Sequence, residues 1–297
     1  MRQGTYSIVA RDARTGRLGV AAQSHWFAVG SLLPWAEEGT GALATQSFGE
    51  RSHRSAAGEM LRDGLGADQV IERLIADDPY EAVRQVAVVD AAGDVAAHTG
   101  AGCVREAGHR LGEGYSCQAS MMLSARVPDA MVAAYEAARG PLDERLLTTL
   151  DAAEAEGGDV RGLQSAVLLV VGDLHVDLRV DDHPDPLAEL RRLHALQRAY
   201  DLSAGAEELV DRGRLDEAEE LFERALEAAP GNDEVLFWAG LATARGGDLA
   251  GGLERVRAAV ELNPRWIELL GRLGPEMAPS AADVRAALDQ HERSRSG

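Results

Sequence analysis

The sequence predicts an α+β domain followed by an all-helical domain. Within residues 1–185, runs of short strands alternate with pairs of helices, and from Pro186 onward the pattern is helical throughout. Single crossover helices would indicate a doubly wound parallel sheet, whereas helix pairs between runs of strands favour antiparallel sheets with helices packed outside them. A four-layer αββα sandwich fits this order of elements.

Periodicity places the individual elements of the first domain. Alternating polar and apolar residues, bounded by turn residues, predict strands over 4–12, 18–24, 29–35, 41–47, 85–90, 95–99, 115–121, 164–171 and 175–180. Apolar residues at helical spacing predict helices over 55–65, 67–76, 128–138 and 143–156. Short turns join the first four strands.

Composition limits the classes of partner. The formal net charge of −19 at pH 7 argues against binding nucleic acid or anionic lipid, and it suits a neutral or cationic small partner. The longest apolar run, 166–171, has the length of a strand and not of a membrane span. The N-terminus lacks the basic region and apolar run of a secretory signal. Cys103 and Cys117 lack metal-ligand spacing, so we expect reduced thiols, a cytoplasmic location, and neither a metal nor a cofactor.

A glycine and a threonine stand at the head of the first strand. Thr5 can act as an N-terminal nucleophile only if the peptide bond after Gly4 is cut. The freed α-amino group, with a pKa near neutrality, would then act as a base for the threonine's own hydroxyl. The other interpretation is that Thr5 is simply a β-favouring residue in a buried strand. The residue pattern leaves both open.

Several phrases of the first domain resemble a bacterial family of unassigned function, domain of unknown function family 1028. The phrases lie in the same order as in the family, over 5–12, 19–24, 44–47, 97–100, 112–115 and 180–186. The family is grouped with the N-terminal-nucleophile (Ntn) hydrolases, and the resemblance covers about residues 3–200. It implies an αββα sandwich and a relationship to proteasome subunits and other amide-cleaving enzymes.

The resemblance also implies roles for individual residues. Thr5 is similar to the nucleophile that autocatalytic cleavage exposes, and Gly4 is similar to the residue before the cut. Backbone N–H groups around Gln46 and Ser47 would hold the oxyanion. The side chains that resemble the acidic and hydroxyl groups of proteasome-like sites are Asp159, Ser165 and Ser120. The sequence offers no lysine for the charged helper of such sites.

Further polar residues on the strands are candidates for substrate binding. They are Ser24, Gln46, Ser47, His98, Gln118 and Gln164. The alternative is that each satisfies nearby backbone groups, which is what buried polar side chains usually do, and for His98 we favour this alternative. The segment 181–185 has the residue types of a metal site, but its proline and aspartates favour a strand exit followed by a helix cap.

The helical region contains an internal repeat of 34 residues. Its matching pairs are Gly213 and Gly247, Leu215 and Leu249, Ala225 and Ala259, and Pro230 and Pro264. Over about 199–266 the chain resembles tetratricopeptide repeats. We therefore expect a connector helix over 186–201 and repeats with capping helices over 202–297. Such repeats bind a protein partner or a second subunit, and we expect a homo-oligomer.

These observations favour an Ntn-type amidohydrolase of a small amide or peptide-like substrate. A second hypothesis is a non-catalytic ligand-binding or assembly protein built on the same fold, with the repeats as its docking arm. A third is an uncleaved hydrolase that uses an internal residue such as Ser24 or His98 around a metal.

Overall fold

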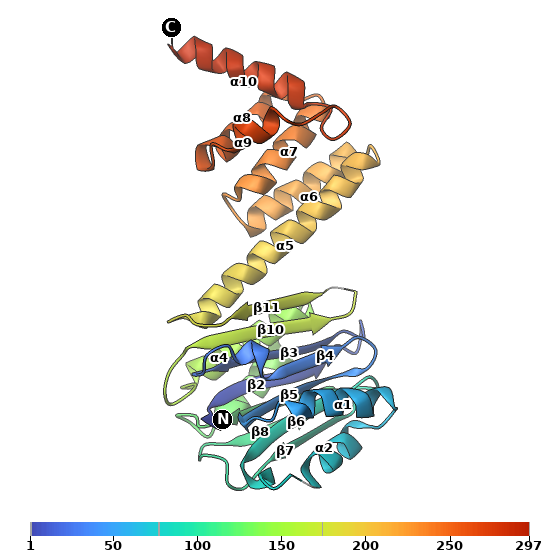
Figure 1. Cartoon of the computed structure of the whole chain (residues 1–297), viewed down its shortest axis with the longest axis vertical. Helices are drawn as coiled ribbons and strands as arrows, with labels where there is room; N and C mark the ends of the chain where they lie inside the picture. The colour runs from blue at the N-terminus through green and yellow to red at the C-terminus, as the bar shows by residue number, and fades with distance from the viewer. Residues whose placement is uncertain (1, 77, 174, 297) are drawn as a thin grey trace. The chain divides into compact units, whose positions relative to one another are not determined.

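The computed structural model describes residues 2–76, 78–173 and 175–296, and it forms two compact units (Figure 1). The first unit is Met1–Arg191 and contains all the strands that the structure describes. The second is Arg192–Gly297 and is helical. In the described part of the chain, no helix combines the length and the hydropathy needed to cross a membrane.

Two antiparallel sheets form the centre of the first unit. The five-stranded sheet comprises β1 (Arg2–Gln3), β4 (Pro34–Glu37), β5 (Gly41–Phe48), β6 (Arg84–Asp90) and β7 (Val95–Thr99). Its order is β1-β5-β6-β7, with β4 also paired to β5. The six-stranded sheet runs β11-β10-β3-β2-β9-β8. Its strands are β2 (Thr5–Arg11), β3 (Leu18–Ser24), β8 (Gly108–Gly112), β9 (Tyr115–Ser120), β10 (Ser165–Val171) and β11 (Val176–Val180).

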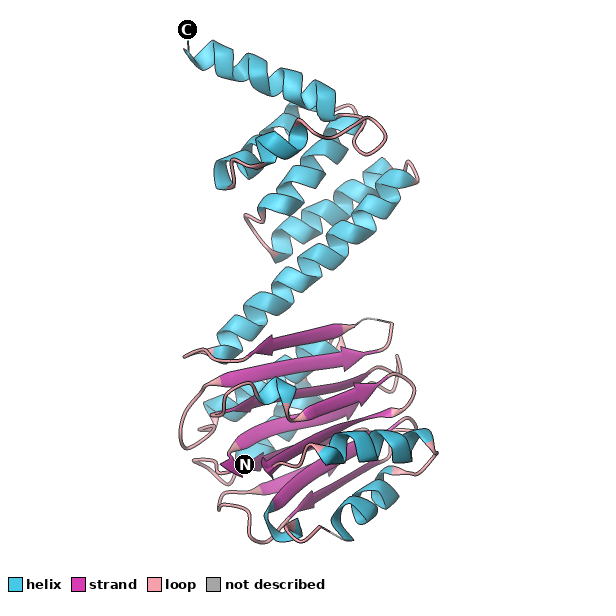
Figure 2. Cartoon of the chain, in the orientation of Figure 1, coloured by secondary structure: helices cyan, strands magenta, loops and turns pink. Residues whose placement is uncertain are grey.

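Helices contact the outer face of each sheet. In the first unit they are α1 (Ser52–Arg62), α2 (Ala67–Ala76), α3 (Val127–Ala137) and α4 (Leu142–Ala155). The pair α1 and α2 packs on β4, β5, β6 and β7 of the five-stranded sheet, and the pair α3 and α4 packs on the six-stranded sheet (Figure 2). The prediction of an α+β domain with antiparallel sheets and outer helices is therefore confirmed.

Alternation along the strands divides the core into layers. Small side chains such as Ala42 and Ala44 of β5 face the other sheet, where they meet Val9 and Val20. Leu43, between them in the sequence, faces the opposite way and packs under α1 and α2. Because successive side chains of a strand point to opposite faces, β5 contributes to both layers and is buried on both sides.

The predicted strand over 29–35 is wrong in its first half. Val29–Ser31 forms a 3-10 turn (η1), preceded by Ala28 in the left-handed region at φ 55°, and β4 begins only at Pro34. The hydroxyl of Ser165 donates to the Trp26 carbonyl at 2.6 Å and accepts from the Val29 amide at 3.2 Å. These bonds hold the loop against β10, so its backbone does not join a ladder.

The second unit is built from helices of 5 to 26 residues, and the first of them begins at the end of the first unit. They are α5 (Pro186–Asp211), α6 (Leu215–Ala228), α7 (Asp233–Arg245), α8 (Leu249–Leu262), α9 (Trp266–Leu270) and α10 (Ala281–Ser296). Asp185 caps α5, because its carboxylate accepts from the Ala188 amide at 3.0 Å. The helix continues without a break through residue 211. Gly240 and Gly252 allow α7 and α8 to approach closely, since a Cβ on Gly240 would lie 2.8 Å from the Gly252 carbonyl oxygen.

Leu43 and Leu111 differ in burial, so truncating them to alanine should lower the free energy of unfolding by different amounts. Leu43 is fully buried under α1 and α2, so Leu43→Ala should lower the free energy of unfolding by about 2–5 kcal/mol. Leu111 on the edge strand β8 is 51% exposed, and Leu111→Ala should cost about 0.5 kcal/mol or less. Urea denaturation followed by circular dichroism measures both. Equal losses would contradict the layer assignment.

Candidate functional site

Four hydroxyl side chains form a row across neighbouring strands of the six-stranded sheet. Thr5 of β2 pairs directly with Ser120 of β9 and with Ser24 of β3, and Ser24 pairs with Ser165 of β10. Directly paired residues share a face of the sheet, so the four side chains point the same way. None is more than 1% exposed. The row faces the five-stranded sheet, because Ser7, two residues after Thr5, bonds to Gln46 of β5.

Three hydrogen-bond donors converge on the carbonyl oxygen of Gly4, which belongs to the peptide bond before Thr5. Thr5 Oγ1 lies 2.7 Å from this oxygen, and Ser24 Oγ donates to it at 2.6 Å. Arg161 Nη2 donates to it at 3.1 Å. The two hydroxyl oxygens are themselves 3.0 Å apart. Donors aimed at one carbonyl oxygen polarise it and stabilise negative charge that develops there.

Asp159 holds Arg161 in place. Its carboxylate is fully buried and accepts from Arg161 Nη2 at 2.7 Å, from Nε at 3.0 Å and from the Arg161 amide at 2.9 Å. A Cβ on Gly4 would lie 2.7 Å from both the Asp159 carboxylate and the Arg161 guanidinium, so a side chain there would displace this ion pair. The prediction from sequence considered only a lysine as the charged helper of the site, so it did not include Arg161. The available signal was that all 30 basic residues of the chain are arginine, one of them two positions after Asp159.

Buried amides link the Thr5 backbone to both sheets. Gln46 Nε2 donates to the Thr5 carbonyl at 3.1 Å and to Gln85 Oε1 at 2.7 Å, while Gln46 Oε1 accepts from Ser7. Gln118 Nε2 in turn donates to Ser7 Oγ at 2.7 Å. All five residues are fully buried. Such a network is stabilising only because its members are paired, and it fixes one arrangement of the two sheets. Gln85 was not predicted.

A cavity of about 360 Å³ is lined by strand neighbours of the residues on either side of the Gly4–Thr5 bond. Its walls are mostly apolar and are formed by Ser47, Phe48, Tyr80, Val83, Gly102, Val104, Ser120 and Met121. Ser47 pairs with Gln3 and Ser120 pairs with Thr5, so the two serines flank the bond. Ser120 Oγ is buried and has no hydrogen-bond partner among the described residues. It is therefore available to a bound molecule.

Two of these wall residues have unusual backbone conformations. Ser47 has φ 63° and Met121 has φ 65°, both in the left-handed region that side chains other than glycine rarely adopt. Ser47 immediately follows Gln46 of the amide network, and Met121 immediately follows Ser120 of the hydroxyl row. Strained backbone of this kind is concentrated at functional sites.

Charge near the cavity is compensated within the protein. The Arg84 guanidinium lies 5.7 Å from the Phe48 ring and 5.6 Å from the Tyr80 ring, and it pairs with Asp78 at 2.6 Å and with Glu50 at 3.6 Å. Burial is the largest single influence and raises the pKa of Asp78, but the hydrogen bonds from Arg84 and the Tyr80 amide, together with the positive charge of Arg84, outweigh it and the pKa is lowered. The carboxylate thus stays charged beside Arg84, and the cavity favours an uncharged group.

The remaining predicted residues lie elsewhere. His98 on β7 contacts the Glu81 carbonyl at 2.9 Å through Nε2. Gln164 donates to the Asp182 carboxylate at 3.1 Å on the protein surface. Ser165 belongs to the row, but its hydroxyl is occupied by the loop before β4. The structure therefore gathers Thr5, Ser24 and Ser120 with Asp159, and it leaves His98 and Gln164 outside this group.

Comparison with known proteins assigns the first unit to a protein family. Residues 5–190 match the model of a family of unknown function, DUF1028. The chain belongs to this family. The chain is 30% identical to protein SPO2555 from Silicibacter pomeroyi, a DUF1028 protein of known crystal structure. That match has a TM-score of 0.60 and covers 64% of this chain and 88% of the other. No curated protein matches the chain.

Two glutamines provide a matched test of the amide network. Gln46→Leu would remove partners from Gln85 and Ser7 in a buried layer, so we expect a loss of about 2–4 kcal/mol in unfolding free energy. Gln164→Leu removes one surface hydrogen bond and should cost about 0.5 kcal/mol or less. Denaturant unfolding of both variants measures the difference. A small effect at Gln46 would mean that the network does not hold the sheets together.

Proposed function

We propose that this DUF1028 protein is an N-terminal-nucleophile amidohydrolase, with Thr5 as its nucleophile and an αββα sandwich of the Ntn type as its first unit. The observation that carries the proposal is the convergence of Thr5 Oγ1, Ser24 Oγ and Arg161 Nη2 on the Gly4 carbonyl oxygen. This carbonyl belongs to the bond that must be cut to free the Thr5 amine. Donors there suit a self-cleavage step better than a structural turn.

The cleavage step follows from this geometry. Thr5 Oγ1 attacks the carbonyl carbon of Gly4, so that a C–O ester bond forms while the peptide C–N bond breaks. The hydroxyl proton passes to the departing nitrogen, which becomes the α-amino group of Thr5. Water then hydrolyses the ester: its oxygen joins the Gly4 carboxyl group, and the Thr5 hydroxyl is restored. Ser24 and Arg161 stabilise the negative charge that develops on the carbonyl oxygen.

The same groups serve the mature enzyme. The free α-amino group of Thr5 acts as a base for the threonine hydroxyl, because a terminal amine has a pKa of about 7.7–8.0. Removal of residues 1–4 opens the space beside Ser47 and Ser120. A substrate carbonyl then takes the position of the Gly4 carbonyl, next to the apolar cavity of about 360 Å³. We infer a small, uncharged amide or peptide-like substrate, since Arg84 is already neutralised.

We further propose a tetratricopeptide-like character for the second unit. The period of 34 residues and the close approach of α7 and α8 at Gly240 and Gly252 support it. The role of such a unit would be to bind a protein partner or a second copy of the chain.

A non-catalytic ligand-binding protein is the alternative function. It is favoured by the complete burial of Thr5, whose nitrogen is in a peptide bond with Gly4. In that case the cavity beside Ser120 would bind a ligand without any cleavage. The two functions differ in whether a chain that begins at Thr5 is formed.

Intact-mass spectrometry separates the two functions. We expect purified protein to contain a species that begins at Thr5, and we expect Thr5→Ser to produce the corresponding species. Thr5→Ala should remain uncut and should lack amidase activity against a panel of acyl and aminoacyl coumarin amides, because no hydroxyl is present to attack. Full-length wild-type protein that hydrolyses these amides as fast as processed protein would refute the proposed nucleophile.

The rate of processing tests the role of Ser24. Ser24→Ala removes one of the donors to the Gly4 carbonyl oxygen, and loss of such a donor slows acyl transfer by about 10²–10³-fold. Ser52→Ala on the exposed start of α1 is the control and should leave the rate unchanged. The fraction of cleaved chain, followed over time after synthesis, gives both rates. Equal rates in the two variants would remove Ser24 from the mechanism.

A further inference from the structure

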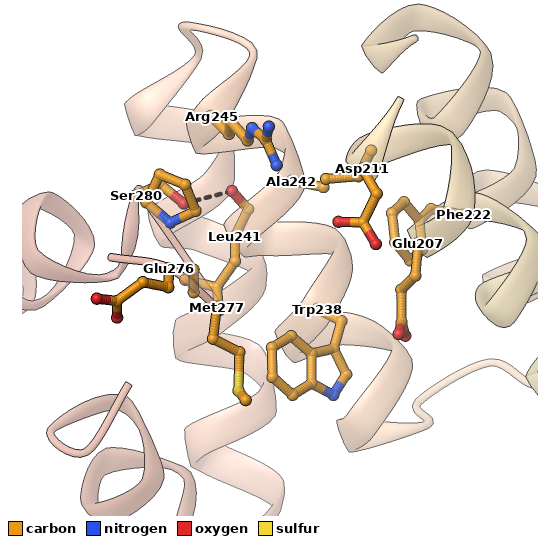
Figure 3. Close-up of a pocket in the computed structure, with 13 residues that line it drawn as sticks. Glu207, Asp211, Phe222, Trp238, Leu241, Ala242, Arg245, Glu276, Met277 and Ser280 are labelled. Atoms are coloured by element: carbon orange, nitrogen blue, oxygen red, sulfur yellow. Dashed lines mark hydrogen bonds between the residues drawn. The ribbon is translucent and has the colours of Figure 1, made fainter. Parts of the chain in front are cut away.

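The second unit contains a cavity of about 570 Å³, which lies outside the candidate site (Figure 3). Its walls come from the C-terminal turns of α5, from α6 and α7, and from the segment 276–280 before α10. This volume is in the range of sites that enclose small ligands. Because every wall belongs to the second unit, the cavity is a feature of the helical region alone.

One wall of this cavity is apolar. Leu241 of α7 is 4% exposed, and Trp238 lies on the same helix with its ring toward the open space (Figure 3). Met277 reaches toward Trp238 from the segment before α10 (Figure 3). Phe222, which is fully buried, lines the cavity from α6. Met277 is 72% exposed, which is high for a large apolar side chain. An aromatic ring next to a flexible thioether suits the apolar body of a ligand.

The facing wall is acidic. Glu207 and Asp211 are four residues apart on α5, so they lie on one face of the helix, and Figure 3 shows their carboxylates across from Trp238. Neither forms an ion pair with another described residue. Glu207 is accessible to solvent, but its partial burial raises its pKa; the charges of Glu234 and Asp211 raise the pKa further, and a hydrogen bond with Ser203 lowers it. The two carboxylates place like charges on one side of the cavity, where a cation would be attracted.

Basic residues of the chain do not supply that cation. Arg245 lines the same cavity, but it lies beyond Ala242 at one end, and among described residues it forms no ion pair with either carboxylate. An anionic ligand would be repelled by Glu207 and Asp211. A hydrated metal ion would gain nothing from the apolar wall. The net charge of −19 also raises the local concentration of cations around the protein.

We propose that this cavity binds a small organic cation, an ammonium or guanidinium group carried on an apolar body. The cation lies between the carboxylates of Glu207 and Asp211, and the body packs against Trp238, Leu241 and Met277. The indole face also attracts a cation directly. This binding site is independent of the proposed hydrolase chemistry of the first unit.

Three probes of one shape and different charge test the proposal on the full chain by isothermal titration calorimetry. Phenethylammonium should bind with a dissociation constant of about 1 mM or lower. Phenethyl alcohol, which lacks the charge, should bind at least about tenfold more weakly, and phenylacetate should not bind. Equal binding of the amine and the alcohol, or no saturable binding of the amine, would overturn the proposal.

Paired double variants place the binding in the cavity. Glu207→Gln with Asp211→Asn should weaken phenethylammonium binding at least about tenfold. The control, Glu208→Gln with Glu220→Gln, makes the same change of charge on α5 and α6 outside the cavity walls and should stay within about twofold. Both pairs are exposed, so the helical circular dichroism should be unchanged. An equal loss of phenethylammonium binding in both double variants would mean that net charge alone causes the effect. That result would overturn the assigned site.

Discussion

The antiparallel register of β2 with its two neighbours is the constraint on which the candidate site depends. It places Thr5 opposite Ser24 on one side and opposite Ser120 on the other. A shift by one residue would turn these hydroxyls to the helix-covered face. The same shift would move Val9 out of the apolar layer between the sheets. The packing of the core therefore also fixes the positions of these hydroxyl groups.

Polar and apolar contacts share the space between the two sheets. Toward one end, Val9, Val20 and Ala44 pack without polar partners. Toward the other, Ser7, Gln46 and the other amides are joined in a hydrogen-bonded network that ends at the Thr5 carbonyl. Apolar packing tolerates small displacements, whereas paired amides do not, because a displaced donor is left buried and unsatisfied. Side-chain positions are therefore most tightly constrained at the polar end.

Periodicity was sufficient for most of the fold and for part of the site. Alternation located the strands and placed Thr5 and Ser24 at strand ends, whereas Ser120 was predicted only through the family resemblance. It failed at 29–31, where a hydroxyl from β10 holds a loop that has a strand-like sequence. It also missed Arg161, because the contact that brings this residue to the site is with a backbone carbonyl 157 positions away. Long-range polar pairing is visible only in three dimensions.

The choice of arginine for every basic position has a chemical consequence. Guanidinium groups stay protonated at any pH a protein tolerates and are poor nucleophiles, whereas lysine side chains compete for acylating reagents. In a sequence with thirty arginines and no lysine, the terminal nitrogen is the sole primary amine. An electrophile that reacts with amines would thus mark one atom per molecule of this sequence: the nitrogen of Met1 in an uncut chain, or, if the proposed cleavage takes place, the nitrogen of Thr5 next to its own hydroxyl.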